Sequence, residues 1–213
     1  MHILTEDQYL VEMEPVLKQI FYIEVDYDDD ILFTSSIPGR RIFYVGSVYL
    51  DDSLLNAVIH AAHFLSDTGC YITILDRFPT RNRHCYISLE EMHTASLQDE
   101  LNHNFGMEFW FDYVIYSAQG KWGLLSTAGK FGLLGGSHEF VEQVELAFPS
   151  LNNQVYDFLQ HWKEEEIYSI EHTKYPEMLI RVKTGIPNLL QHVYGDELAM
   201  RMLQEVGLCL DDR

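Results

Sequence analysis

The stretch KWGLLSTAGKFGLLGG, residues 121–136, decides the fold class of this chain. It holds two runs of β-type residues, KWGLLST and KFGLLGG, which are separated at Ala128-Gly129. A third run, EFWFDYVIYS at 108–117, precedes them and ends at the turn residues 118–120. Short strands that follow one another through tight turns form hairpins. The stretch therefore predicts an antiparallel meander.

A capping box and a proline predict the structure of the first 20 residues. Thr5 followed by Gln8 matches a capping box, which marks the start of a helix. Pro15 lacks a backbone N–H and interrupts a helix, so two short helical pieces are predicted. The apolar residues with helical spacing in this segment are Leu10, Met13, Leu17 and Ile20.

Further strands and one long helix are predicted between these pieces and the meander. Asp51 or Asp52 begins the helix as its N-cap, and the helix ends near Gly69. The predicted strands are FYIEV (21–25), DILFTSS (30–36), RRIFYVGSVYL (40–50) and CYITILD (70–76).

The sequence after the meander is helical. Ser137 is a predicted N-cap, and Asp196 caps a last helix that ends at Gly207. Together with the meander this predicts an α+β fold, a mainly antiparallel sheet with flanking helices and a C-terminal helical segment. No Gly/Ser-rich or Pro-rich linker interrupts the chain, so residues 1–213 are predicted to form a single compact unit. In that unit a helical tail (150–213) packs on an α+β body (1–149).

Charge restricts the partners of this protein. Against 14 Lys and Arg stand 33 Asp and Glu, a formal net charge of −19. Such a field repels nucleic acid and anionic lipid and favours a basic protein as partner, although solubility is a second explanation of the charge. The aromatic run at 109–116 lacks the positive charge of a base-stacking surface, so it is assigned to the core.

The cysteines and the N-terminal segment indicate where the protein works. Cys70, Cys85 and Cys209 are widely spaced without a CxxC pair, which fits a reducing compartment. The sequence contains neither a signal-peptide pattern nor about 18 consecutive apolar residues, so a cytoplasmic protein without a membrane span is expected. No nucleotide-binding glycine motif is present, and no cofactor is predicted.

The stretch IEVDYDDD at 23–30 is the most acidic short segment and supplies the candidate partner-binding residues. It does not match an EF-hand loop, because Ile31 and Ile37 stand where that loop needs Gly and Glu. Three interpretations stay open: a solvated turn, a looser calcium site at a hairpin tip, and a patch that binds a basic protein, which is the favoured functional one. We call its carboxylates the aspartate cluster: Asp26, Asp28, Asp29 and Asp30.

Other candidate sites are weaker. His60 and His63 lie three apart on the predicted helix, with Asp67 expected on the same polar face, but no third histidine or HExxH run accompanies them. A solvated helix face is therefore favoured over a metal site. The sequence GGSHEF lacks the GxSxG pattern of a nucleophilic serine, and Cys85 beside His84 is expected to be a surface thiol.

One basic island stands out in the acidic chain. The segment RFPTRNRH at 77–84 contains Arg77, Arg81 and Arg83 around a proline turn. Its role stays open.

The segment YSAQGKWGLLSTAGKFGLLGGSHEFVEQVELAFP, residues 116–149, resembles a pattern in small bacterial immunity-type proteins. The resemblance covers about 30 residues of the 213 and brings no catalytic residue with it. It implies a non-enzymatic binding protein that neutralises a basic, nuclease-type toxin domain. Two alternatives stay open: a small hydrolase or metal-dependent enzyme that uses His60 and His63, and a structural or assembly subunit.

Overall fold

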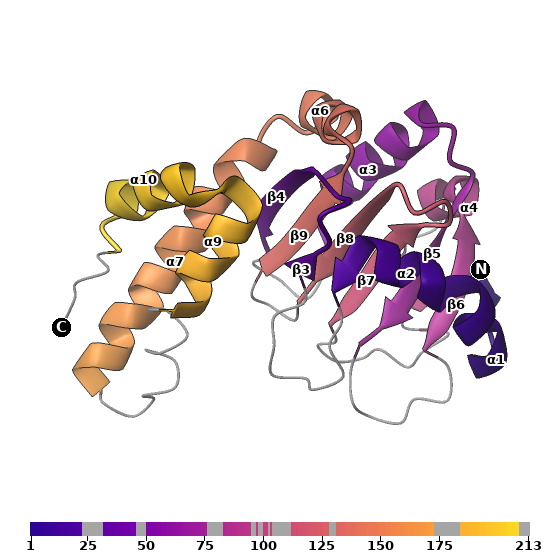
Figure 1. Cartoon of the computed structure of the whole chain (residues 1–213), viewed down its shortest axis with the longest axis horizontal. Coiled ribbons are helices and arrows are strands. Elements are labelled where there is room, and N and C mark those ends of the chain that lie inside the picture. Colours follow the sequence, from indigo (N-terminus) through magenta and orange to yellow (C-terminus); the bar gives the residue numbers. More distant parts are fainter. Residues whose placement is uncertain are drawn as a thin grey trace.

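The structure is a computed structural model that confirms the α+β class, with a seven-stranded antiparallel sheet between helices (Figure 1). The strand order is β1-β6-β5-β7-β8-β9-β4, and β2 pairs with β3 in a separate two-stranded sheet. The structure describes residues 1–22, 32–45, 50–75, 83–94, 97, 100–101, 103, 112–127, 131–172 and 184–208.

The predicted meander is confirmed as β7, β8 and β9, which pair in sequence order. The strands are β1 (His2–Ile3), β2 (Phe21–Tyr22), β3 (Leu32–Phe33), β4 (Gly39–Tyr44), β5 (Gly69–Ile74), β6 (His84–Ser88), β7 (Tyr113–Ser117), β8 (Trp122–Ser126) and β9 (Phe131–Gly136).

Helices cover both faces of the large sheet. They are α1 (Glu6–Gln8), the π-helix η1 (Tyr9–Met13), α2 (Glu14–Ile20), α3 (Asp52–Phe64), α4 (Leu89–Thr94), α6 (His138–Ala147), α7 (Leu151–His172), α9 (Ile186–Tyr194) and α10 (Asp196–Val206).

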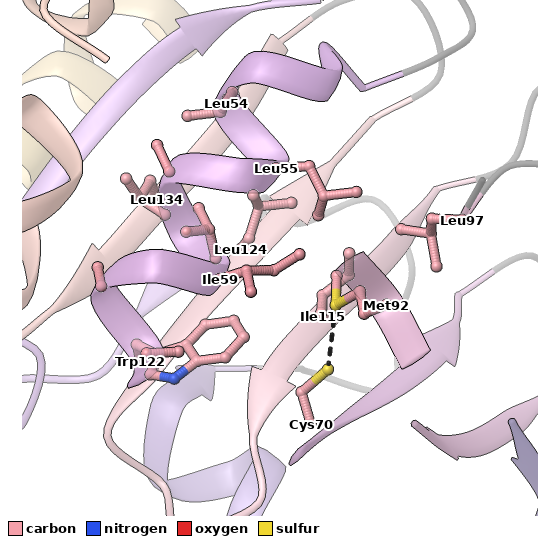
Figure 2. Close-up of a cluster of buried hydrophobic side chains, with 14 of the residues drawn as sticks. Leu54, Leu55, Ile59, Cys70, Met92, Leu97, Ile115, Trp122, Leu124 and Leu134 are labelled. Atoms are coloured by element: carbon pink, nitrogen blue, oxygen red, sulfur yellow. Dashed lines mark hydrogen bonds between the residues drawn. The ribbon is translucent and has the colours of Figure 1, made fainter. Parts of the chain in front are cut away.

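One face of the sheet packs against α3, α4 and α6. Side chains alternate along a strand, so Ile72 and Ile115 point to this face while Tyr71 and Val114 point to the other. Figure 2 shows Ile59 of α3 beside Trp122 and Leu124 of β8 in this core. The thiol of Cys70 lies 3.6 Å from the sulfur of Met92 in the same cluster.

The opposite face is covered by α2, the β2–β3 hairpin and the tail helices. Glycines in β8 and β9 allow aromatic rings to approach the sheet backbone. A Cβ atom at Gly135 would lie 2.7 Å from the Phe33 ring, and one at Gly132 would lie 1.9 Å from the Phe43 ring on the other face. Only a residue without a side chain lets these rings pack there.

The N-terminal segment begins as predicted and then departs from a regular helix. Thr5 and Gln8 form the capping box, and Pro15 lies in the first turn of α2. The π-helix between α1 and α2 changes the helical phase. Leu10 is therefore 48% exposed, which corrects its expected inward position, while Met13 is fully buried.

The position of Cys85 is a second correction. Its strand β6 begins at His84, the last residue of the basic island, and pairs with β5 and β1. Cys85, expected as a surface thiol, is fully buried in β6, and burial raises the pKa of its thiol to about 12. A thiol with so high a pKa stays protonated at neutral pH and is not a nucleophile.

The tail helices pack on the edge of the sheet at β4 (Figure 1). Phe158 and Trp162 of α7 belong to the same buried cluster as Ile42 of β4 and Leu133 of β9. The description of residues 1–213 as one compact unit stays a prediction. Among the described helices, none has the length and apolar character that a membrane crossing needs.

Candidate functional site

Most of the charged segments singled out in the sequence lie outside the described residues. This holds for the whole aspartate cluster and for Arg77 and Arg81 of the basic island. Arg83, the last arginine of the island, is half-buried directly before β6.

The structure separates the candidate metal ligands. His60 and His63 are exposed on α3, as expected for a solvated helix face. Asp67 lies three residues beyond the end of α3 and is only 2% exposed, so its expected place on the polar face of that helix is wrong. Within the described part of the chain, no three His, Cys, Asp or Glu side chains gather in a possible metal site.

Asp67 instead joins the loop after α3 to the β7–β8 hairpin. Its Oδ2 atom accepts hydrogen bonds from Ser117 Oγ at 2.6 Å and from Trp122 Nε1 at 2.8 Å. Both donors are buried, and Oδ1 is buried without a hydrogen-bond partner. A buried carboxylate with neutral donors is a structural link, because removing it would leave two donors unsatisfied.

A second buried polar cluster lies on the opposite face of the sheet. His84 stacks on Tyr9 with ring centroids 3.7 Å apart, and its Nδ1 lies 3.2 Å from Thr73 Oγ1. Its Nε2 lies 3.8 Å from a carboxylate oxygen of Glu6. Thr73 Oγ1 also lies 3.3 Å from the hydroxyl of Tyr116. The order carboxylate, imidazole, hydroxyl is that of a nucleophilic triad.

Burial argues against catalysis at this cluster. Thr73 is 3% exposed and Tyr116 is fully buried, so a substrate cannot reach the hydroxyl. Burial, followed by the charge of Arg83, lowers the pKa of His84 to about 4. The imidazole is therefore neutral at pH 7 and serves as a hydrogen-bonding part of the core.

An exposed acidic surface lies on the outer side of α7. The inner side of this helix is buried through Val155, Phe158, Leu159 and Trp162. The spacing of 3.6 residues per turn places a second set of residues on the outer side. These exposed side chains are Tyr156, Asp157, Gln160 and Glu164.

Helix α10 extends this surface. Ala199, Met202 and Leu203 are buried, whereas the exposed residues of the helix are Asp196, Glu197, Met200, Arg201, Gln204 and Glu205. Tyr156 donates a hydrogen bond from its hydroxyl to Glu205 at 2.9 Å, which joins the two helices. The name acidic face is used below for these residues: Tyr156, Asp157, Gln160, Glu164, Glu197, Met200, Gln204 and Glu205.

Arg201 is exposed on α10, four residues from both Glu197 and Glu205, but in the described part of the chain it forms no ion pair with a carboxylate of the acidic face. In the described part of the chain, no Lys or Arg lies within 4.0 Å of Asp157, Glu164, Glu197 or Glu205. Glu145 of α6 differs, because Arg41 binds it at 2.6 Å. The hydrogen bond to Glu205 raises the pKa of the Tyr156 hydroxyl, since the bond to a carboxylate favours the protonated phenol.

The cations of the same helices are few. Lys163 of α7 donates to the backbone oxygen of Val206 at 2.7 Å, so it stabilises the C-terminal end of α10. Arg201 is the single basic residue of α10. Together α7 and α10 contain eight acidic and two basic residues.

The chain matches no protein-family model, no curated protein and no solved structure. Function is therefore inferred from the surface itself. Exposed apolar groups within the acidic face, Tyr156 at 37% and Met200 at 39%, are of the types enriched in protein interfaces. The spacing of Asp157 and Glu164 in the sequence predicts that both lie on one face of a helix. No sequence pattern predicts that α7 packs against α10.

Proposed function

We propose that this protein is a non-enzymatic binding protein whose acidic face captures a basic protein. The observation that carries the proposal is a set of four exposed carboxylates without a Lys or Arg partner in the described part of the chain, next to an exposed tyrosine and methionine. Binding a basic surface would give these charges the partners that the chain does not supply.

The physical role of the acidic face is to attract and to hold. Complementary charge steers the encounter and raises the association rate, mostly at low ionic strength. Tyr156 and Met200 supply apolar area for the centre of the contact, where interfaces lose water and gain most of their affinity.

The aspartate cluster belongs to the same proposal. Its four carboxylates lie within five positions of the sequence and add to the negative field of the chain. Charges within a Debye length of about 8 Å act together on an approaching partner. The cluster is proposed as a second contribution to the capture of a basic protein.

The resemblance of residues 116–149 to immunity-type proteins supports a narrower form of the proposal. In that form the partner is a nuclease-type toxin domain, which is basic because it binds nucleic acid. The narrower form predicts that the captured protein loses nuclease activity in the complex.

The test is affinity capture from the native host with immobilised protein in three forms. The wild-type chain and a control variant are expected to retain the same basic protein, and the face variant is expected to lose most of it. The face variant is Asp157→Asn, Glu164→Gln, Glu197→Gln and Glu205→Gln. The control variant removes the same charge from exposed positions elsewhere: Asp7→Asn, Asp52→Asn, Glu139→Gln and Glu142→Gln.

Retention of the same protein by all three forms would place the contact away from the acidic face. If both variants lost the same amount of captured protein, the net charge of the chain and not the acidic face would explain the capture. Circular dichroism and a melting curve show whether each variant is folded before the capture is compared.

A further inference from the structure

A pocket in the body has the opposite character to the acidic face. It has a volume of about 660 Å³, in the range of small-molecule sites. Five separate segments meet around it: the end of α2, the β3–β4 turn, the loop after α3, the β7–β8 turn and the start of α6. The described residues that line it include Lys18 and Lys121 and no carboxylate.

Lys121 is the better positioned cation of the pocket. Its side chain is half-buried, and its ammonium donates one hydrogen bond, to the backbone oxygen of Leu65 at 2.8 Å. An ammonium has three N–H donors, so two remain. No carboxylate of the described residues lies within 4.0 Å of it.

Lys18 lies at the rim. It is 62% exposed and forms an ion pair with Glu14 at 2.9 Å, one turn earlier in α2. Glu14 is 30% exposed, and ion pairs between side chains in contact with water contribute little to stability. Lys18 can therefore turn to a charged ligand in the pocket without a large loss.

Other donors face the same space. Ser35 lines the pocket, is exposed and has no hydrogen bond to any described residue. Ser137 lines it as the N-cap of α6 and binds the N–H of Phe140, so the positive end of a ten-residue helix borders the pocket. Ile37, Pro38 and Leu65 form an apolar part of the lining.

We propose that this pocket binds a small organic anion. Its carboxylate or phosphate group would lie on Lys121 with Lys18 and Ser35 beside it, and its apolar part would lie on Ile37, Pro38 and Leu65. The observation that carries this assignment, in a chain of net charge −19, is a pocket lined by two lysines and by no carboxylate of the described residues, in which Lys121 has no carboxylate within 4.0 Å in that part of the chain. The proposal is independent of the acidic face.

The experiment is a titration of the ¹⁵N-labelled protein followed by its amide signals. The probes are phenyl phosphate and benzoate, with benzyl alcohol as a neutral probe of similar shape. Saturable shifts of Ser35, Gly120 and Ser137 are expected with at least one anion below about 10 mM, and none with benzyl alcohol. The comparison of the two anions identifies the preferred head group.

Two variants make the result specific. Lys121→Met is expected to weaken binding of the anion at least about tenfold, whereas Lys163→Met is expected to leave it within about twofold. Lys163 is a matched control because its ammonium also donates to a backbone oxygen, at 2.7 Å. If Lys121→Met does not fold, Lys18→Met replaces it, since this exposed side chain is not part of the core.

The proposal is overturned if neither anion gives saturable shifts at these amides. It is also overturned if benzyl alcohol binds as tightly as the anions, or if Lys121→Met and Lys18→Met both bind as the wild type does.

Discussion

Asp67 and Asp157 are the same chemical group in two different roles. Asp67 is 2% exposed and accepts hydrogen bonds from Ser117 and Trp122. Asp157 lies exposed on α7 with no Lys or Arg within 4.0 Å in the described part of the chain. The first carboxylate therefore belongs to the fold, and the second is available to a partner.

The acidic residues of the chain therefore form two groups with different roles. A count of 33 acidic residues predicts the sign of the surface field but not which carboxylates hold the structure. Buried carboxylates with donors affect stability, whereas exposed ones without cations affect association.

Replacing Asp67 by Ala is expected to cause the largest loss of stability. The change leaves the buried donors of Ser117 and Trp122 without an acceptor, and we expect the free energy of unfolding to fall by about 2–4 kcal/mol. Urea unfolding measures it. The matched variant Asp157→Ala is expected to change stability by no more than about 0.5 kcal/mol. Similar losses of unfolding free energy in both variants would contradict the different roles assigned to Asp67 and Asp157.

The buried base His84 is expected to make stability depend on pH. Its pKa is about 4 in the folded protein, below the ordinary value of about 6.5 that it regains on unfolding. The unfolded chain therefore binds more protons between these values, so His84 destabilises the fold as the pH decreases from about 6.5 towards 4. With these two pKa values the loss between pH 7 and pH 5 should be about 2 kcal/mol.

The measurement compares unfolding free energies at these two pH values for wild type, His84→Gln and His60→Gln. The exposed His60 serves as the control. Wild type and His60→Gln should lose more stability than His84→Gln on acidification. An equal loss in all three proteins would contradict the lowered pKa of His84. The charged neighbours of its imidazole are Glu6 and Arg83.

Replacing the aspartate cluster by four Asn residues is expected to have the smallest effect on folding. Mutual repulsion of close carboxylates offers no stability, so the melting temperature should stay within about 2 °C of the wild-type value. Association with the basic partner should become slower at low salt. A large loss of stability would assign the cluster a structural role instead.

The sequence predicted best what local chemistry determines. Gly120, with a φ of 73°, lies in the turn after β7, and Thr5, Ser137 and Gly207 mark helix ends by capping. These features depend on residues a few positions apart. They can be recognised without knowledge of the rest of the fold.

Features that depend on distant contacts were missed. The strand β6 begins at the last residue of the basic island, and its pairing with β1 joins residues far apart in the sequence. The sequence predicts Asp67 on the polar face of α3, but its position is determined by hydrogen bonds from Ser117 and Trp122 of the β7–β8 hairpin. The pocket and the acidic face likewise arise from segments that only tertiary packing brings together.

The most direct test of the central claim is the association rate of the captured basic protein with the face variant and the control variant. At low salt the face variant should associate about tenfold more slowly than wild type, and the control variant should differ by much less. The difference should nearly vanish at 1 M salt, where the Debye length is about 3 Å. Equal rates for the two variants at low salt would contradict the claim that the acidic face binds the partner.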